Sequence, residues 1–148
     1  MNDDILKLEN QLCFPLYAAA RTVVNSYKPL LDEIDLTYTQ YIAMMVMWEH
    51  KSVGVKELGK NLYLDSGTLT PLLKRLEAKG FVTRARSRED ERVVNVTITE
   101  AGEALKEKAV EIPLKLGKCM PLTREEGGTL YTLLYKILQQ LNCGDKTE

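Results

Sequence analysis

Three cysteines are the residues of this chain whose chemistry depends most on their surroundings. Cys13, Cys119 and Cys143 are dispersed along 148 residues, and His50 is the single histidine. Their spacing matches neither a zinc site nor a CxxC redox pair, and His50 has no obvious catalytic partner. We therefore expect no metal, no cofactor and no enzyme such as a thiol peroxidase. The chemistry that remains is the oxidation of individual thiols.

Cys13 is the most promising of the three thiols. Pro15 suits the first turn of a helix, so Cys13 is predicted at or just before the first helical residue. The free amides and the dipole at that end stabilise a thiolate, which attacks peroxides and first gives a sulfenic acid. A second interpretation is equally open: Leu12, Phe14 and Leu16 surround Cys13, and a cysteine is often a small buried hydrophobe.

Residues 64–102 indicate a different activity, the recognition of DNA. Asp65 and Ser66 can cap the start of a short helix, and Gly80 suits its left-handed end. Pro71 either removes one backbone hydrogen bond or moves the helix start towards Thr68. Four leucines share one face of this helix: Leu69, Leu72, Leu73 and Leu76. The candidate contacts to bases and phosphates are Ser66, Thr68, Thr70, Lys74 and Arg75.

A hairpin is predicted directly after this helix. Its strands cover residues 81–86 and 92–98, the polar turn covers 87–91, and the second strand is rich in β-branched residues. An ordinary solvated hairpin is the alternative, but the cations here are all arginines, which read phosphates and grooves. Asp90 can hold Arg92 stiff for insertion into a minor groove. The candidate DNA-binding residues of the hairpin are Arg84, Arg86, Asp90 and Arg92.

Basic side chains are concentrated in one part of the chain, as expected of a protein that contacts DNA through one region. The whole chain has 20 basic and 21 acidic side chains, whereas Lys74 to Arg92 holds seven basic residues against four acidic ones. No apolar run approaches the length of a membrane span, and the acidic start of the chain lacks a secretory apolar segment. We expect a cytoplasmic protein without a membrane partner.

Most of the remaining chain is predicted to be helical. The first expected helix is marked by Leu16 to Tyr27 and is ended or kinked at Pro29. Further helices are expected over 39–49, 55–62 and 100–118, the last of these with a bend at Pro113. A final helix is marked by Leu130 to Leu141. The helices at the two chain ends carry more apolar surface than a small DNA-binding module can cover. A symmetric homodimer is therefore expected, because it would also present two recognition helices to a pseudopalindromic operator in double-stranded DNA.

The run DSGTLTPLLKRLEAKGFVTRARSREDERVVNVTITEAG resembles the winged helix-turn-helix of the MarR family of bacterial repressors, and the family's Asp-x-Arg wing motif stands here as Asp90-Glu91-Arg92. NQLCFPLYAAAR (10–21) and DLTYTQYIAMMVMWEH (35–50) are similar to the branch of organic-peroxide sensors typified by OhrR. The resemblance implies a mainly α fold with a small β-hairpin wing. It also implies a single domain over 1–148, with dimerisation helices in 1–36 and 100–148 and a DNA-binding region in 37–99.

The same resemblance implies roles for individual residues. Cys13 would be the peroxide-reactive thiol, Tyr27 and Tyr38 would hydrogen-bond its sulfur, and Cys119 of the other subunit would resolve the sulfenic acid as a disulfide. A low-molecular-weight thiol is the competing resolver, and Cys143 is expected to be uninvolved. The implied function is a repressor that releases its operator when organic hydroperoxides oxidise Cys13. Release by a small phenolic ligand is the alternative.

The geometry of a helix adds one constraint to this assignment. If Cys13 and Tyr27 share one helix, the fourteen residues between them correspond to a rise of about 21 Å. One side chain cannot bridge that distance. The tyrosines that contact Cys13 are therefore expected to come from the other subunit.

Overall fold

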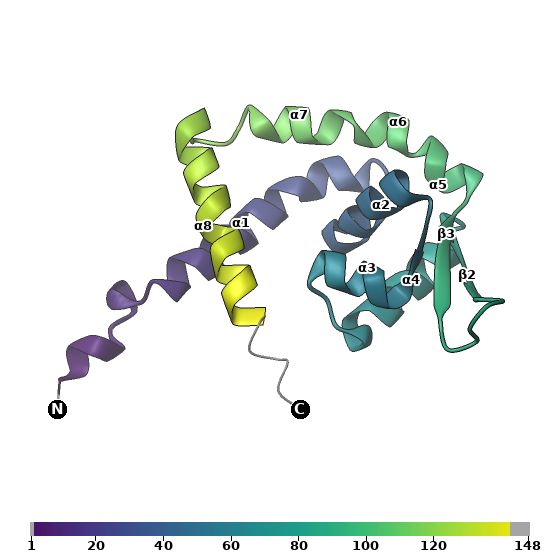
Figure 1. Cartoon of the computed structure of the whole chain (residues 1–148). Coiled ribbons are helices and arrows are strands. Elements are labelled where there is room, and N and C mark those ends of the chain that lie inside the picture. Colours follow the sequence, from purple (N-terminus) through teal and green to yellow (C-terminus); the bar gives the residue numbers. More distant parts are fainter. Residues whose placement is uncertain (1, 143–148) are drawn as a thin grey trace. The chain divides into compact units, whose positions relative to one another are not determined.

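The computed structural model describes residues 2–142 and is mainly helical, with a small antiparallel sheet (Figure 1). The chain divides into two compact units, Met1–Leu116 and Gly117–Glu148. The helices are η1 (Asp3–Leu6), η2 (Leu8–Asn10), α1 (Cys13–Asp32), α2 (Tyr38–His50), α3 (Val55–Leu62), α4 (Ser66–Ala78), α5 (Glu100–Ala104), α6 (Lys106–Ala109), α7 (Glu111–Gly117) and α8 (Arg124–Asn142). The strands are β1 (Ser52–Gly54), β2 (Val82–Arg86) and β3 (Val94–Ile98).

Helix α2 runs through the core of the first unit. Thr37 and Gln40 form a capping box at its start, which satisfies two amide donors and fixes where the helix begins. Apolar side chains of α2, α3, α4 and the sheet pack into one cluster with the end of α1 and with α6 and α7. The most completely buried large side chains are Leu31, Met44, Met47, Leu58, Leu69, Leu73, Leu76, Val82 and Val96. Because α2 is packed in this core, the side chains at its two ends are held in fixed positions.

Helices α3 and α4 form the predicted helix-turn-helix pair. The Asp65 carboxylate accepts a hydrogen bond of 2.7 Å from the Thr68 amide and so caps α4, as the sequence predicts. Gly80 adopts a φ of 78°, which agrees with the expected left-handed end. Pro71 lies inside α4, so the helix starts at Ser66 and the backbone loses the bond that an amide at position 71 would donate.

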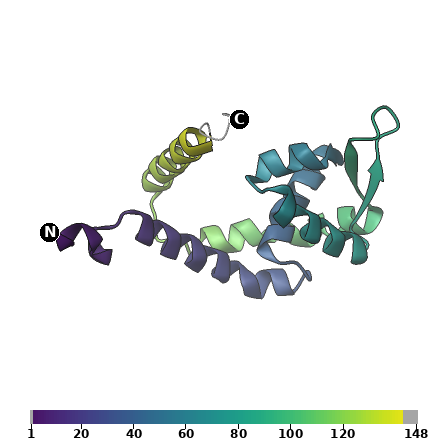
Figure 2. The ribbon, with the colours of Figure 1, turned by 90° about the horizontal axis from the view of Figure 1, so that it is seen from below.

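The sheet has the strand order β1-β3-β2, and the protruding hairpin of β2 and β3 (residues 82–98) is called the wing below (Figures 1 and 2). In the wing Val82 pairs with Ile98, and Arg86 pairs with Val94. The sequence predicts this hairpin but not β1, whose three residues are too few to show an alternating pattern. The turn is also longer than predicted, because the second strand begins at Val94 rather than at residue 92.

Of the two outcomes expected at Pro29, an end or a kink of the first helix, the end was wrong. Helix α1 continues through Pro29 to Asp32, where Leu31 is buried in the core. Proline removes only its own amide from a helix, and the burial of Leu31 offsets that loss. As a result α1 is a helix of 20 residues whose first half extends away from α2, α3 and α4 (Figure 2).

Residues 100–118 were expected to form one helix, but they form the three short helices α5, α6 and α7. The interruptions fall at Leu105 and Val110, which keep right-handed helical dihedral angles, so the path stays rod-like (Figure 1). Pro113 lies in the first turn of α7, where a missing amide is tolerated, and no interruption falls there.

The start of α5 is joined closely to α2 and to the sheet. The Trp48 indole donates a hydrogen bond of 2.9 Å to the Gly102 carbonyl, and the Lys51 ammonium pairs with Glu103. A Cβ atom built on Gly102 would lie only 2.2 Å from the Phe81 carbonyl oxygen, so only glycine permits this approach. These contacts fix α5 against the end of α2 and against the residues that precede β2.

Helix α8 belongs to the second unit and carries the predicted apolar stripe. Leu134 and Leu138 are half-buried, whereas the other members of the stripe are exposed: Leu130, Leu133, Ile137 and Leu141. Such a stripe is typical of a helix that packs against another surface. Within residues 2–142, no helix combines the length and the apolar character needed to cross a membrane.

Candidate functional site

Cys13 is the first residue of α1, in agreement with the prediction from Pro15. The N-cap residue Leu12 makes no side-chain capping bond, and the first turn contains no acidic residue. No side chain of the first turn therefore competes for the first amides of the helix or for the positive end of its dipole. Cys13 is exposed, so the alternative of a small buried hydrophobe does not describe it within one chain.

Three tyrosines form a cluster where the second half of α1 meets the start of α2. The Tyr27 and Tyr38 rings meet edge to face with centroids 4.9 Å apart. Tyr41 lies 6.0 Å from Tyr27 and 6.4 Å from Tyr38, measured between ring centroids. Trp48 continues the series at 6.2 Å from Tyr41. The structure thus brings together Tyr27 and Tyr38, which the sequence analysis singles out, and adds Tyr41, which it does not name as a site residue.

Two phenols of the cluster, those of Tyr38 and Tyr41, have raised pKa values. Burial, and then the neighbouring Tyr27, raises the pKa of Tyr38 above the usual value for tyrosine. The pKa of Tyr41 is raised by burial and then by both other tyrosines. Neutral phenols can donate hydrogen bonds, and donors of this kind favour an anionic acceptor such as a thiolate.

Cys13 does not reach these tyrosines within one chain. Cys13 and Tyr27 both lie on α1, and the fourteen residues between them correspond to about 21 Å of rise. Cys119 is exposed and lies in the second compact unit. Cys143 lies outside the described residues.

The first half of α1 presents an apolar surface around Cys13. Leu31 is the one residue of α1 that is fully buried, and four large apolar side chains of this helix are exposed: Phe14, Leu16, Tyr17 and Val24. An apolar patch of this extent is typical of a surface that another protein chain covers.

The candidate DNA-contacting face of α4 is exposed as predicted. The four leucines of the helix are buried, and five polar side chains on other sides are exposed: Ser66, Thr68, Thr70, Lys74 and Arg75. The Thr68 amide and hydroxyl lower the pKa of Asp65, so this carboxylate is an anionic cap. The helix can therefore insert hydroxyls near its start and long cations further along.

In the wing, Asp90 holds Arg92 as the sequence predicts. Arg92 donates two bonds to Asp90, from Nε to Oδ1 at 3.1 Å and from Nη2 to Oδ2 at 3.3 Å. This bidentate contact lowers the pKa of Asp90 and orients a guanidinium whose side chain is 90% exposed. Arg86 donates from Nη1 to the Glu91 carbonyl at 2.8 Å, which ties the strand to the turn.

Arg84 differs from the other arginines of the wing. Its Nε donates to the Glu77 carboxylate at 2.9 Å, and its side chain is only 24% exposed. Arg84 therefore joins α4 to the wing, and this contact competes with a direct contact to DNA. The pair is not evident from the sequence, because the two residues come from different elements.

A cleft of about 480 Å³ separates α4 from the wing. Its lining includes Thr70, Arg84 and Arg92, which the sequence singles out, and also Lys56 from the first turn of α3. Sequence reasoning missed Lys56. Among residues 2–142 no carboxylate lies within ion-pair distance of Lys56, so its charge remains available to an anion. The sequence signal that could have identified Lys56 is its place in the helix that precedes the recognition helix.

Comparison with known proteins identifies the family of this chain. Residues 25–109 match the family described as Transcriptional regulator SarA/Rot. The chain is 52% identical over 142 residues to the Organic hydroperoxide resistance transcriptional regulator of Bacillus subtilis, covering 94% of this chain and 95% of that protein. These relatives are named as transcriptional regulators, not as enzymes.

Solved structures of AbfR from Staphylococcus epidermidis share the fold. Reduced AbfR bound to DNA superposes with a TM-score of 0.79 at 32% identity, over 96% of this chain and 97% of that one. The disulfide-formed AbfR gives 0.68 at 33% identity, over 95% and 96%. This chain therefore belongs to the MarR/SarA family of transcriptional regulators, in the branch of the organic hydroperoxide resistance regulators.

Proposed function

We propose that this protein is a homodimeric repressor that binds a pseudopalindromic operator and releases it when an organic hydroperoxide oxidises Cys13. The observation that carries the proposal is the placement of Cys13 at the exposed start of α1, far from the Tyr27 and Tyr38 pair on the same chain. The name of the Bacillus subtilis relative supports the class of oxidant. The DNA-bound form of AbfR supports the class of partner.

In the proposed complex the exposed face of α4 enters the major groove, and the wing lies along the adjacent minor groove. Arg92, oriented by Asp90, enters the minor groove, where a guanidinium is favoured by the negative potential. Lys56 contacts a backbone phosphate from the cleft between α4 and the wing. Two such modules related by a two-fold axis bind two half-sites together.

The proposed sensing site is shared between subunits. The apolar first half of α1 packs against the partner subunit, which brings Cys13 of one chain to Tyr27 and Tyr38 of the other. The phenols donate hydrogen bonds to the thiolate, and the helix start adds its dipole. Both interactions favour the thiolate over the thiol.

The chemistry follows from a thiolate held in this way. The Cys13 sulfur attacks one oxygen of the hydroperoxide, an S–O bond forms, the O–O bond breaks, and the alkoxide leaves as an alcohol after taking a proton. Sulfur is oxidised by two electrons to a sulfenic acid, and the hydroperoxide is reduced by two. The thiol of Cys119 from the partner subunit then displaces water from the sulfenic acid and forms a disulfide.

Oxidation would release DNA by moving the two winged modules relative to each other. A sulfenic acid no longer accepts the phenolic hydrogen bonds as a thiolate does, and a disulfide constrains the ends of two helices. Both half-sites must be engaged together, so a modest rigid-body displacement is enough. A coupling of about 1–3 kcal/mol between oxidation and binding lowers operator affinity roughly 5- to 150-fold.

The proposed function is tested by measuring operator affinity for the reduced protein, for the protein after one equivalent of cumene hydroperoxide, and again after dithiothreitol. We expect tight binding, loss of binding and recovery. Binding that is indifferent to the hydroperoxide would contradict the proposal. Release by a small phenolic acid under the same conditions would instead favour the ligand-released alternative.

The role of Cys119 is tested in a Cys143→Ser background, so that two cysteines remain in each chain. After stoichiometric cumene hydroperoxide we expect a crosslinked dimer on a non-reducing gel, and none after the additional change Cys119→Ser. An unchanged crosslink in the double variant would rule out this pairing. A mixed disulfide formed only when a small thiol is added would identify the competing resolver.

Lys56→Ala should lower operator affinity with little dependence on base sequence, because Lys56 is proposed to contact phosphate. The slope of log affinity against log salt should become shallower by about 0.9 for one lost phosphate contact. Fluorescence anisotropy over a salt series measures this slope. Lys60→Ala is the matched control, since Lys60 is an exposed lysine of α3 that does not line the cleft; equal losses in both variants would contradict the specific role of Lys56.

A further inference from the structure

The Lys79 ammonium group joins the end of α4 to the turn between α1 and α2. Lys79 is the C-cap residue of α4, and its Nζ atom donates hydrogen bonds to the Asp35 carbonyl and, at 3.3 Å, to Gln40 Oε1. The Asp35 carboxylate lies 3.2 Å from the same nitrogen. An ammonium group has three hydrogens to donate, and three acceptors lie around this one. The Lys79 side chain is only 27% exposed, so most of it is covered by the protein.

Asp35 adopts a backbone conformation that L residues rarely take. Its φ is 53° in a turn of the Schellman type, in which the Asp35 amide donates to the Asp32 carbonyl at 3.2 Å and the Leu36 amide to the Leu31 carbonyl at 3.1 Å. Glycine is the usual residue at this position, and aspartate is one of the few others that tolerate it. In this conformation the carbonyl and the carboxylate of Asp35 both reach Lys79. The strained residue therefore stands where both of its polar groups contact the end of another helix.

Gln40 connects Lys79 to the first turn of α2. The Gln40 side chain is buried, and its Oε1 atom accepts a hydrogen bond of 3.1 Å from the Thr37 amide as part of the capping box. The same oxygen accepts the bond from Lys79. Tyr38, which meets Tyr27 edge to face, is the first residue of α2 and lies between the two halves of this capping box. Lys79 therefore contacts the helical turn that carries a tyrosine of the cluster.

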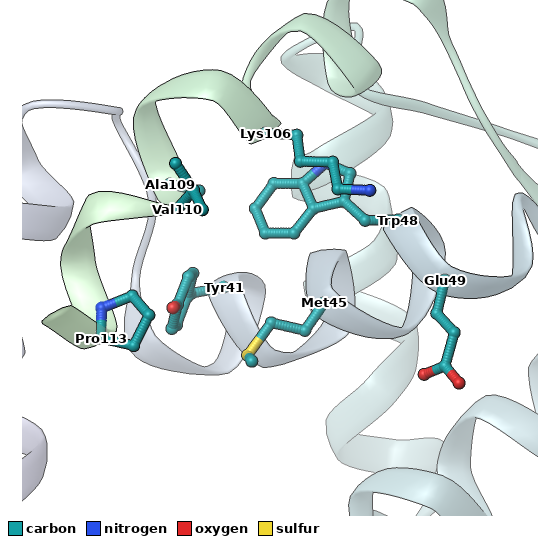
Figure 3. A pocket seen from close by; sticks show the side chains of 8 residues that line it. All are labelled: Tyr41, Met45, Trp48, Glu49, Lys106, Ala109, Val110 and Pro113. Carbon is teal, nitrogen blue, oxygen red and sulfur yellow. The ribbon is translucent and has the colours of Figure 1, made fainter.

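The start of α2 presents tyrosines on one face and Gln40 on another. The Tyr38 and Tyr41 rings lie 6.4 Å apart, and Tyr41 points from α2 towards α6 and α7 (Figure 3). Gln40 instead faces Lys79 at the end of α4. The first turns of α2 are thus contacted by the tyrosine cluster on one side and by the end of the recognition helix on the other.

Lys79 makes all the hydrogen bonds and ion pairs that join the end of α4 to the junction of α1 with α2, among residues 2–142. The other side chains that hold α4 against α2 belong to the apolar core. Apolar burial is not directional, whereas hydrogen bonds are. Lys79 also directly precedes Gly80, the left-handed residue that ends α4 before the wing begins. The contacts of Lys79 therefore fix where the end of α4 lies relative to the start of α2.

We infer that Lys79 is a positioning residue that transmits the oxidation state of Cys13 from the start of α2 to the end of the recognition helix. The inference rests on the proposed function, because it names the contact through which that sensing site acts on DNA binding. In the reduced dimer the hydrogen bond to Cys13 of the partner subunit holds Tyr38, and Gln40 and Asp35 hold Lys79. Oxidation removes that hydrogen bond and displaces the first turn of α2, and Lys79 carries the displacement to α4. Lys79 takes no part in the transfer of electrons.

The first experiment measures operator affinity by anisotropy for the reduced protein and for the protein after one equivalent of cumene hydroperoxide. The ratio of the two dissociation constants reports the coupling. Lys79→Met should lower the wild-type ratio by about tenfold, or to unity where the wild-type ratio is smaller, which is the effect of one charge-assisted hydrogen bond. A residue that only stabilised the fold would weaken both forms alike and leave the ratio unchanged.

Lys28→Met is the matched control for this ratio. Lys28 pairs with Asp32 at 3.0 Å, and both residues lie on α1, so this ion pair joins no two elements. The variant removes one lysine and one ion pair near the same turn. It should keep the wild-type ratio.

The second experiment measures the rate at which cumene hydroperoxide oxidises the Cys13 thiol. Lys79 contacts Asp35 and Gln40 rather than the phenols, so Lys79→Met should be oxidised at the wild-type rate. Lys79→Arg should restore part of the affinity ratio, because a guanidinium can donate to the same acceptors. Asp35→Asn keeps the left-handed turn and the carbonyl acceptor but removes the ion pair. Its ratio should fall between those of Lys79→Met and the wild type.

A folded Lys79→Met protein with the wild-type ratio would overturn the inference, whether or not both of its affinities are lower. If thermal unfolding by circular dichroism shows that Lys79→Met does not fold, Asp35→Asn decides, and a wild-type ratio in that variant would overturn the inference. An oxidised wild type that binds the operator as tightly as the reduced protein would instead overturn the proposed function, on which the role of Lys79 depends.

Discussion

Cys13→Ser should bind the operator as tightly as the reduced wild type and should remain bound at hydroperoxide concentrations that release the wild type completely. A serine hydroxyl is close in size to a thiol but does not attack an O–O bond, since the thiolate is the nucleophile. Position 13 is exposed at the start of α1, so the substitution leaves no cavity in the core. Operator anisotropy titrated with cumene hydroperoxide measures the effect.

Cys143→Ser is the matched control for this experiment, because it removes a thiol that the proposed mechanism does not use. It should release DNA at the same hydroperoxide concentration as wild type. If Cys13→Ser were released as readily as wild type, the sensing role of Cys13 would be wrong. If it failed to bind the operator before oxidant was added, Cys13 would have a structural role that its exposure does not suggest.

Arg92→Ala should lower operator affinity by about 1–3 kcal/mol, roughly 5- to 150-fold, without lowering the thermal stability of the protein. The Arg92 side chain is 90% exposed, and its bonds go to Asp90 in the same turn, so the folded core does not depend on it. Asp90→Ala should have a smaller effect, because the guanidinium remains present but is no longer held in one orientation.

Anisotropy measures the affinities, and thermal unfolding by circular dichroism measures the stability. Arg124→Ala removes an exposed arginine of α8 and serves as the control for a general loss of positive charge. An Arg92→Ala protein with the same operator affinity as Arg124→Ala would exclude the wing from the DNA interface. A large fall in the melting temperature would mean that the affinity loss came from unfolding.

The parts of the fold that were predicted correctly are those specified by local signals. The four leucines and the Asp65 cap define α4 within a few residues, and the β-branched run defines β3. The position of Cys13 at the start of α1 also follows from a local preference, that of Pro15 for a first turn. Each of these features can be read from a window of a few residues.

The features that were missed depend on contacts between elements that are distant in the sequence. Strand β1 forms because Ser52–Gly54 pairs with the edge of β3 that β2 does not occupy. Three residues alone do not predict this pairing. The Arg84–Glu77 pair and the cleft around Lys56 arise only when α3, α4 and the wing are brought together. Helix α1 continues through Pro29 because the core buries Leu31 beyond it.

In the candidate sensing site, too, some residues were predicted from the sequence and others were missed. Tyr27 and Tyr38 were identified through a resemblance, and their 4.9 Å contact agrees with a shared site. Tyr41 was not among the predicted site residues, and its contacts with Tyr27 and Tyr38 became visible only once α1 and α2 were packed together. The assignment of Cys119 depends on a second subunit and remains a prediction.

A mixed dimer tests most directly whether the sensing site is shared between two chains. One chain carries Cys13→Ser with intact tyrosines, the other carries Tyr27→Phe and Tyr38→Phe with an intact Cys13, and two different affinity tags isolate the mixed species. The oxidation rate of its single Cys13 by cumene hydroperoxide is then measured. The account predicts the wild-type rate, because that sulfur meets the tyrosines of its partner; a rate as slow as that of the homodimer lacking both hydroxyls would contradict it.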